Sequence, residues 1–165
     1  MLTVEQNEEL TRIGPGTPMG ELLRRYWYPI AFEQDFDTVP TKTVRLLSEN
    51  WTLFKTPKSG RYGIVAEACP HRNASLTYGV VHEDGIRCGY HGMRFNAQGD
   101  CVHVPSQATC PRSMGVRTYA TLERGPLVWI WMGDPALADP ALIEDFHWMD
   151  DPGWRHKGEL LHVEG

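Results

Sequence analysis

Residues 69–95 read CPHRNASLTYGVVHEDGIRCGYHGMRF, and the order of the metal-ligand residues in this stretch determines how the whole chain is interpreted. Cys69 and His71 are separated by one residue, and Cys88 and His91 are separated by two. In an extended chain residues i and i+2 point to the same side, so Cys69 and His71 can face one site across the intervening proline. The glycines that bracket the second pair predict a tight turn, which lets Cys88 and His91 converge as well.

Three kinds of metal centre could use two thiols and two imidazoles. A structural zinc site usually groups Cys with Cys and His with His, although zinc tolerates many arrangements. A mononuclear iron oxygenase site needs two His and a carboxylate, and not thiolates. A binuclear cluster with different ligands on its two irons explains the alternation, because each loop then supplies its Cys to one iron and its His to the other. A zinc-stabilised structural module stays open as a remote alternative.

The two pairs resemble the Rieske 2Fe–2S signature, C-x-H followed by C-x-x-H, whose ligation places two His on one of the two irons. The resemblance implies that Cys69 and Cys88 bind one iron and that His71 and His91 bind the other. It also implies a mostly β fold, namely a Rieske-type antiparallel β-sandwich with short N-terminal helices and an acidic C-terminal extension. The cofactor expected in this chain is therefore a Rieske-type 2Fe–2S cluster.

The branch of the Rieske family is indicated by residues near the ligands and by the flanks. Respiratory Rieske proteins carry a disulfide between the two cluster loops, where this chain has Ala74 and Tyr90, and a Ser where it has Met93. The segments LTRIGPGTPMGELLRRYWYPIAF and GDPALADPALIEDFHWM resemble the large subunit of phthalate-dioxygenase-type, ring-hydroxylating oxygenases. Two positions depart from that family, which often has Trp at Met93 and Gly at Asn73.

The chain divides into three predicted parts: a helical segment over 1–30, a Rieske 2Fe–2S domain over 31–132, and a linker with the start of a catalytic domain over 133–165. Thr3 and Gln6 have capping-box spacing, a first helix could end at Gly14, and Thr17 with Pro18 begins a second helix to about Trp27. Short strands follow, with turns expected at 83–85 and 96–99. The runs that predict strands are KTVRLL, WTLFKT, YGIVAEA, GVVHE, GIRCG, MRFNA, CVHVP, VRTYATLE and PLVWIWM.

Composition excludes several other functions. The chain has 165 residues, a net charge of −5 and 41% hydrophobic residues, so it lacks the basic excess of a nucleic-acid-binding protein. No apolar run is long enough to span a bilayer. The acidic start MLTVEQNEEL is no signal peptide, which favours a cytoplasmic location where thiols stay reduced. From Arg124 to Arg155 no Lys or Arg intervenes, which indicates a solvated linker with one short helix or a docking surface for a basic partner.

The family resemblance implies an electron-transfer role. A reductase or ferredoxin would reduce the cluster, and the parent oxygenase, typically a trimer, would pass the electron to a mononuclear Fe(II) that hydroxylates an aromatic or similar substrate. That iron is held by two His and an Asp further along, and no His-x-x-x-x-His pair occurs in this chain. The chain is therefore expected to be the N-terminal, electron-transfer part of an oxygenase and not a catalyst alone. A stand-alone Rieske ferredoxin is the alternative.

Other polar residues have simpler expected roles. Cys101 and Cys110 are expected to be small, buried, hydrophobic side chains and not ligands. Arg72, Arg87 and Arg94 lie within a few residues of the ligands, and they are either solvated or structural charges or a basic rim that meets carboxylates of the electron donor or of a neighbouring subunit. The remaining histidines are expected at the surface or in hydrogen bonds: His82, His103, His147, His156 and His162.

Overall fold

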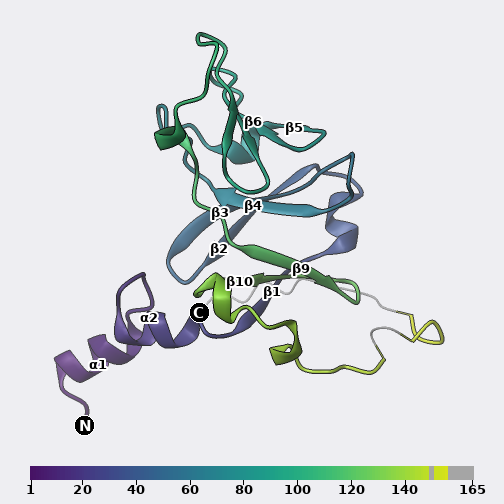
Figure 1. Cartoon of the computed structure of the whole chain (residues 1–165). Coiled ribbons are helices and arrows are strands. Elements are labelled where there is room, and N and C mark those ends of the chain that lie inside the picture. Colours follow the sequence, from purple (N-terminus) through teal and green to yellow (C-terminus); the bar gives the residue numbers. More distant parts are fainter. Residues whose placement is uncertain (149–150, 156–165) are drawn as a thin grey trace.

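The computed structural model describes residues 1–148 and 151–155, and its strands form three antiparallel sheets. Figure 1 shows the sheets one above another, with the four-stranded sheet at the top. The lower sheet has the order β1 (Trp27–Phe32), β10 (Leu127–Trp131), β9 (Ala120–Arg124). The middle sheet is β2 (Thr41–Leu46), β3 (Glu49–Lys55), β4 (Tyr62–Ala66), and the upper one is β5 (Val80–His82), β6 (Gly85–Arg87), β7 (Arg94–Asn96), β8 (Cys101–His103). The predicted mostly β, antiparallel architecture is confirmed.

The middle sheet is buried on both faces, and this explains the nearly continuous apolar runs of β3 and β4. One face packs on the lower sheet through Trp51, Leu53, Ile64, Val128 and Ile130. The other face packs under the upper sheet through Phe54, Val65, Ile86 and Phe95. Because alternate residues of a strand point to opposite faces, each of these two strands contributes to both cores.

The upper sheet is built from two hairpins inserted between β4 and β9. His82 pairs with Gly85, so the tight turn predicted at 83–85 is present between β5 and β6, with Glu83 and Asp84 as its two unpaired residues. At the next turn the side-chain oxygen of Asn96 accepts hydrogen bonds from the backbone N–H groups of Gln98 and Asp100. Both predicted turns are confirmed, and the 69–74 and 88–93 loops lie next to each other at the other end of the strands.

A short 3₁₀ helix, η2 (Leu76–Tyr78), fastens the upper sheet to the middle one. The Thr77 hydroxyl lies 2.9 Å from that of Thr52 and 3.1 Å from that of Thr43, and the Thr77 carbonyl accepts a 2.7 Å bond from Thr41. These bonds fix η2, which follows the first ligand pair, against β2 and β3.

The N-terminal segment confirms two predicted caps and corrects one boundary. Thr3 and Gln6 form a capping box at α1 (Val4–Thr11), and Thr17 caps α2 (Pro18–Leu23). The first helix ends before Gly14, and the prediction that the second one reaches Trp27 is wrong, since β1 begins there. Proline is tolerated at sheet edges and bulges, and Pro29 lies beside a register shift in this edge strand.

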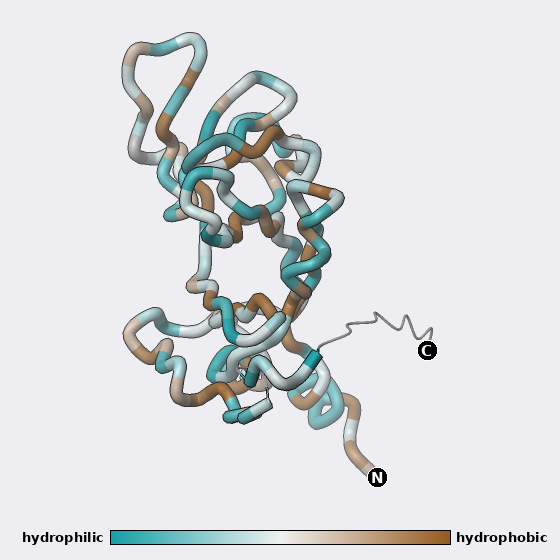
Figure 2. The backbone as a smooth tube through the Cα atoms, turned by 90° about the vertical axis from the view of Figure 1, so that its right-hand side faces the viewer, coloured by the Kyte–Doolittle hydropathy of each residue, from teal (hydrophilic) through white to brown (hydrophobic). Residues whose placement is uncertain are grey.

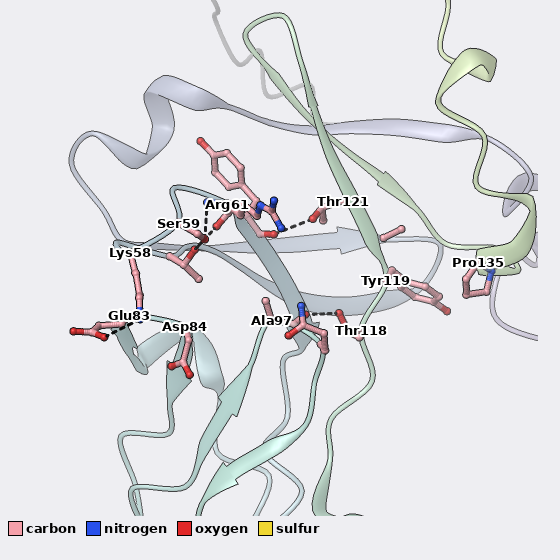
Figure 3. A pocket seen from close by; sticks show the side chains of 14 residues that line it. Lys58, Ser59, Arg61, Glu83, Asp84, Ala97, Thr118, Tyr119, Thr121 and Pro135 are labelled. Carbon is pink, nitrogen blue, oxygen red and sulfur yellow. Dashed lines mark hydrogen bonds and ion pairs between the residues drawn. The ribbon is translucent and has the colours of Figure 1, made fainter.

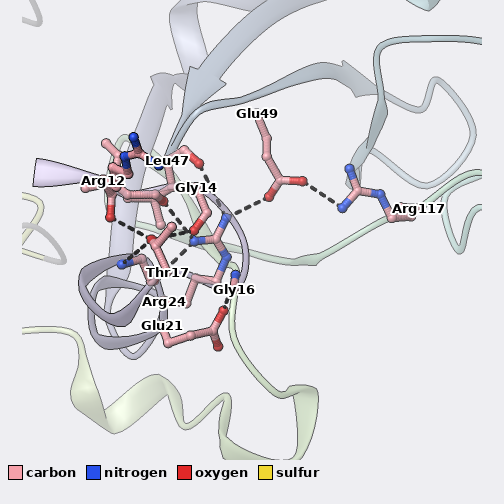
Figure 4. Close-up of polar contacts among 11 residues, drawn as sticks. Arg12, Gly14, Gly16, Thr17, Glu21, Arg24, Leu47, Glu49 and Arg117 are labelled. Carbon is pink, nitrogen blue, oxygen red and sulfur yellow. Dashed lines mark hydrogen bonds and ion pairs between the residues drawn. The ribbon is translucent and has the colours of Figure 1, made fainter. Parts of the chain in front are cut away.

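A buried ion pair ties the N-terminal segment to the sandwich (Figure 4). Arg24 is 5% exposed and donates a 2.9 Å hydrogen bond to Glu49 at the start of β3. Its guanidinium also donates to the carbonyls of Ile13, Gly20 and Leu47. The second Glu49 oxygen lies 2.7 Å from Arg117 Nη1. Removing one partner of such a pair typically costs about 3–5 kcal/mol, so these contacts fix α2 on the sheets.

The acidic C-terminal segment covers the outer face of the lower sheet. Two short 3₁₀ helices, η4 (Pro135–Leu137) and η5 (Pro140–Leu142), replace the single helix expected there. Ile143 is buried beside Trp129, and Trp27 Nε1 donates to the Asp139 carbonyl. The predicted strand near the end of the chain and two histidines, His156 and His162, lie outside the described residues. The division of the chain at residues 30 and 132 stays a prediction.

Figure 2 shows the molecule from the side, with the N-terminus below the sheets and far from the upper hairpins. Two further 3₁₀ helices, η1 (Glu33–Phe36) and η3 (Arg112–Met114), lie in the connections. Within the part of the chain that the structure describes, no helix is both long and apolar enough to cross a bilayer.

Candidate metal centre

The two ligand loops are closed by the same pair of backbone hydrogen bonds. In the first, the Cys69 carbonyl accepts from Asn73 N at 2.8 Å, and Cys69 N donates to the Ala74 carbonyl at 2.9 Å. In the second, the Cys88 carbonyl accepts from Gly92 N at 3.0 Å, and Cys88 N donates to the Met93 carbonyl at 2.8 Å. Each loop is thus a closed turn that begins at its cysteine.

The fifth residue of each loop adopts the left-handed backbone conformation. Asn73 has φ +55° and Gly92 has φ +77°. Glycine meets no steric cost there, and asparagine is among the few other residues that visit this region readily. Asn73, where the family often has glycine, therefore forms the same kind of turn as Gly92.

The two thiols lie together in the core below the loops. Cys69 is 1% exposed and Cys88 is 3% exposed. Burial raises the pKa of the Cys69 thiol, the Cys88 thiol beside it raises this pKa further, and the backbone N–H groups of His71 and Arg72 lower it. Two thiolates placed this close repel each other unless positive charge lies between them, so the pair fits a cationic metal centre.

The two imidazoles lie together on the outer side of the loops. The rings of His71 and His91 are both exposed, and their centroids are 4.6 Å apart in an edge-to-face arrangement. Partial desolvation lowers the pKa of His91, and His71 and Arg72 lower it further. A lowered pKa favours the neutral imidazole, which is the form that binds a metal. The Tyr90 ring covers one side of His91, with 3.7 Å between ring centroids.

A cavity of about 290 Å³ adjoins the two imidazoles. Its opposite wall is residues 104–107, a turn closed by a 3.2 Å bond from Gln107 N to the Val104 carbonyl. Met93 and Met114 complete an apolar lining. Sequence reasoning missed this third wall, and Pro105 within the CVHVP run was the only available sign that the strand stops there.

The four predicted ligands separate into two pairs, which suits the two irons of a binuclear cluster. The structure places the two thiols together in a buried pair and the two imidazoles together in an exposed pair. Among residues 1–148 and 151–155, no three His, Cys, Asp or Glu side chains converge closely enough to hold one ion. A tetrahedral zinc site would need four such groups around one point.

A larger cavity lies away from the ligand loops. It has a volume of about 590 Å³ and opens between the β5–β6 turn, the β7–β8 turn and β9 (Figure 3). Lys58 and Glu83 at its rim form a long ion pair of 3.9 Å. Its lining contains both polar and apolar side chains, and none of the predicted ligands contributes to it.

Comparison with known proteins agrees with this geometry. A family model described as the Rieske [2Fe-2S] domain matches residues 26–120. The chain belongs to this family. Its cofactor is a Rieske-type 2Fe–2S cluster, and the Rieske domain is an electron-transfer domain of the kind found in oxygenase components.

The relatives that the chain matches are longer than the chain itself. The chain is 44% identical over 154 residues to the 5,5'-dehydrodivanillate O-demethylase oxygenase subunit of Sphingobium sp. (strain NBRC 103272 / SYK-6), covering 90% of this chain and 36% of that protein. It is 37% identical to the oxygenase component of dicamba O-demethylase from Stenotrophomonas maltophilia, covering 86% of this chain and 42% of that protein. The chain thus spans less than half the length of these relatives.

A solved structure shows the same fold. The crystal structure of dicamba monooxygenase bound to dicamba superimposes with a TM-score of 0.73 and 36% identity, over 81% of this chain and 42% of that chain. The expected resemblance to the N-terminal portion of an oxygenase large subunit is therefore confirmed.

Proposed function

We propose that Cys69, His71, Cys88 and His91 ligate the cluster, with the two thiolates on one iron and the two imidazoles on the other. The observation that carries this assignment is the separation of the four side chains into a buried thiol pair and an exposed imidazole pair. The bound cluster supplies one-electron chemistry, and the protein tunes it through hydrogen bonds, burial and exposure.

Each ligand pair has a different task in this proposal. The buried cysteines would hold one iron away from water, while the backbone N–H groups of His71 and Arg72 would stabilise thiolate charge. The exposed histidines would hold the other iron where a redox partner can approach it. The Tyr90 ring covers one side of His91, and the turn at 104–107 forms the far wall of the cavity beside both imidazoles.

We further propose that the chain serves as the N-terminal part of a Rieske non-haem iron oxygenase that acts on an aromatic or similar substrate. Identity to the O-demethylase subunit extends over 90% of the chain, well beyond residues 26–120, and this supports an oxygenase over a stand-alone ferredoxin. In this proposal a cytoplasmic reductase or ferredoxin donates electrons, and a catalytic domain carrying a mononuclear Fe(II) receives them. The parent is proposed to be a trimer.

Reconstitution of the chain with ferric iron, sulfide and a thiol reductant under argon tests the assignment. We expect two irons and two acid-labile sulfides per chain, and a midpoint potential near the low end for Rieske centres, about −150 mV. The oxidised cluster carries more positive charge, so a ring proton leaves its ligands more easily in that state, and the midpoint potential should fall as pH rises into the alkaline range. A potential that is flat across the alkaline range, or a colourless zinc protein, would contradict histidine ligation of a cluster.

A further inference from the structure

The upper sheet carries a row of basic side chains on the face that points away from the core. Arg87 on β6 pairs directly with Arg94 on β7, and Arg94 pairs with His103 on β8. Residues directly opposite each other on antiparallel strands lie on the same face. The alternate positions Ile86 and Phe95 are fully buried, so this basic row, Arg87–Arg94–His103, points outward.

The charge of the basic row is not compensated within the described residues. No carboxylate there forms an ion pair with Arg87 or Arg94. Like charges directly opposite each other in a sheet are destabilising. The acidic residues of the β5–β6 hairpin lie in its turn, at the other end of the strands. The repulsion between Arg87 and Arg94 costs stability in the free protein, and the carboxylates of a bound partner would relieve it.

The basic row adjoins the second ligand loop. Arg87 immediately precedes Cys88, and Arg94 follows the residue that closes the loop. Large apolar side chains are exposed around it: Tyr78 is 86% exposed, Val80 47% and Val102 37%. Arginine and tyrosine are enriched at protein interfaces, and an apolar centre with uncompensated charge is typical of a surface that binds another protein.

We propose that the basic row, with Tyr78 and Val80 beside it, docks a carboxylate-rich face of the electron-donor protein. This inference rests on the proposed function, because a donor must reach the cluster and the row borders the loop that holds it. Opposite charge steers encounter and raises association rates by about 10- to 1,000-fold, which suits a partner that binds, transfers an electron and leaves. The whole chain carries −5, so this local positive surface also orients an acidic donor that the rest of the molecule repels.

Binding of an acidic plant-type 2Fe–2S ferredoxin to the reconstituted chain tests the proposal, by titration calorimetry at 20 and 300 mM NaCl. We expect the affinity of the wild type to fall at least about tenfold with salt, because exposed charges are screened within about 10 Å at 0.1 M. Arg87→Gln/Arg94→Gln should bind about tenfold more weakly at low salt and lose most of the salt dependence. Arg87→Lys/Arg94→Lys should retain binding. Stopped-flow reduction of the cluster by the same ferredoxin should follow the same order.

The control variant is Arg45→Gln, which removes an exposed arginine from β2 and should bind like the wild type. Salt-independent binding of the wild type, or unchanged binding of the double Gln variant with full cluster content, would overturn the proposal. If the chain instead self-associates in a salt-sensitive way that the double Gln variant abolishes, the basic row binds a second copy of this chain, and the proposal of donor docking is overturned. Failure to take up two irons would count against the proposed function, whereas the binding titration on the same chain would still decide the role of the row.

Discussion

The two ligand loops differ in sequence but close in the same way. In the first the histidine is the third residue and asparagine takes the left-handed position; in the second the histidine is the fourth residue and glycine takes that position. The backbone hydrogen bonds are nonetheless equivalent, and the two imidazole rings come within 4.6 Å. The closed turn, and not the Cys–His spacing, therefore defines each loop.

The loops also differ in how tightly their surroundings pack. Asn73 is exposed, whereas a Cβ at Gly92 would lie 3.1 Å from the Pro105 ring. Tyr90 stacks on His91, and no ring covers His71 in this way among the described residues. The second loop is held from outside as well as by its own hydrogen bonds, so it should tolerate less change.

The largest expected effect is the same for both loops. Cys69→Ser and Cys88→Ser should each abolish the cluster, because each thiolate neutralises iron charge and a serine hydroxyl does so poorly. Iron and sulfide analysis with visible spectroscopy measures the loss. A Cys88→Ser protein that keeps two irons and a full spectrum would break the equivalence of the loops.

Substitutions at the left-handed positions sharpen the difference between the loops. Gly92→Ala should lower the free energy of unfolding by about 1–3 kcal/mol, from the left-handed backbone and the contact with Pro105. Asn73→Gly should change it by less than about 1 kcal/mol. Thermal unfolding resolves the two, since each kcal/mol shifts Tm by about 2–4 °C in a chain of this size. Equal shifts would show that packing around the loops does not matter.

The loops were predictable where chemistry depends on residue type and spacing. Cys and His at these intervals predicted the ligands, Thr3 and Thr17 predicted the caps, and the Glu83–Asp84 turn predicted a hairpin. The equivalence of the loops was not predictable, because it resides in backbone hydrogen bonds that Asn73 and Gly92 share without a common sequence.

Long-range packing explains the features that were predicted wrongly or not at all. The second helix was predicted from its cap at Thr17 and Pro18 to run to about Trp27, whereas the pairing of β1 with β10, which no local signal indicates, places Trp27 in a strand. Arg24 lies 25 residues from Glu49, and nothing local to either residue indicates a buried ion pair. The wall at 104–107 likewise depends on where a loop returns in space.

A third prediction contrasts the loop thiols with the two thiols outside the loops. Cys101 and Cys110 are partly buried against the core below the loops, as expected of small hydrophobic side chains. Cys101→Ser/Cys110→Ser should keep two irons per chain and lose about 1 kcal/mol of stability through poorer packing. Iron analysis of the purified, folded double variant provides the measurement, and loss of iron would show that the ligands were assigned to the wrong thiols.

The smallest expected effect concerns alkaline stability of the apo chain. Burial, then the neighbouring Cys110 thiol, raises the pKa of Cys101 from 9.0 to about 11. Because the pKa of Cys101 is higher in the folded chain than in the unfolded chain, the protonated thiol contributes to the free energy of unfolding. This contribution is fully present below pH 9 and is lost as pH rises towards 11. Urea unfolding at pH 8, 9.5 and 11 should therefore show a smaller alkaline loss for Cys101→Ala than for the wild type. An identical decline in both proteins would mean that Cys101 ionises as it does in the unfolded chain.

The closed turns have a consequence for cofactor assembly. Ordering a residue costs roughly 1–2 kcal/mol in backbone entropy, and in both loops the hydrogen bonds from Asn73 and Gly92 offset that cost during folding of the chain itself. Metal binding to an unfolded segment would have to supply that ordering free energy instead. The loops thus form a receptor whose shape the chain's own hydrogen bonds create, so cluster binding would not have to supply the free energy that closes them.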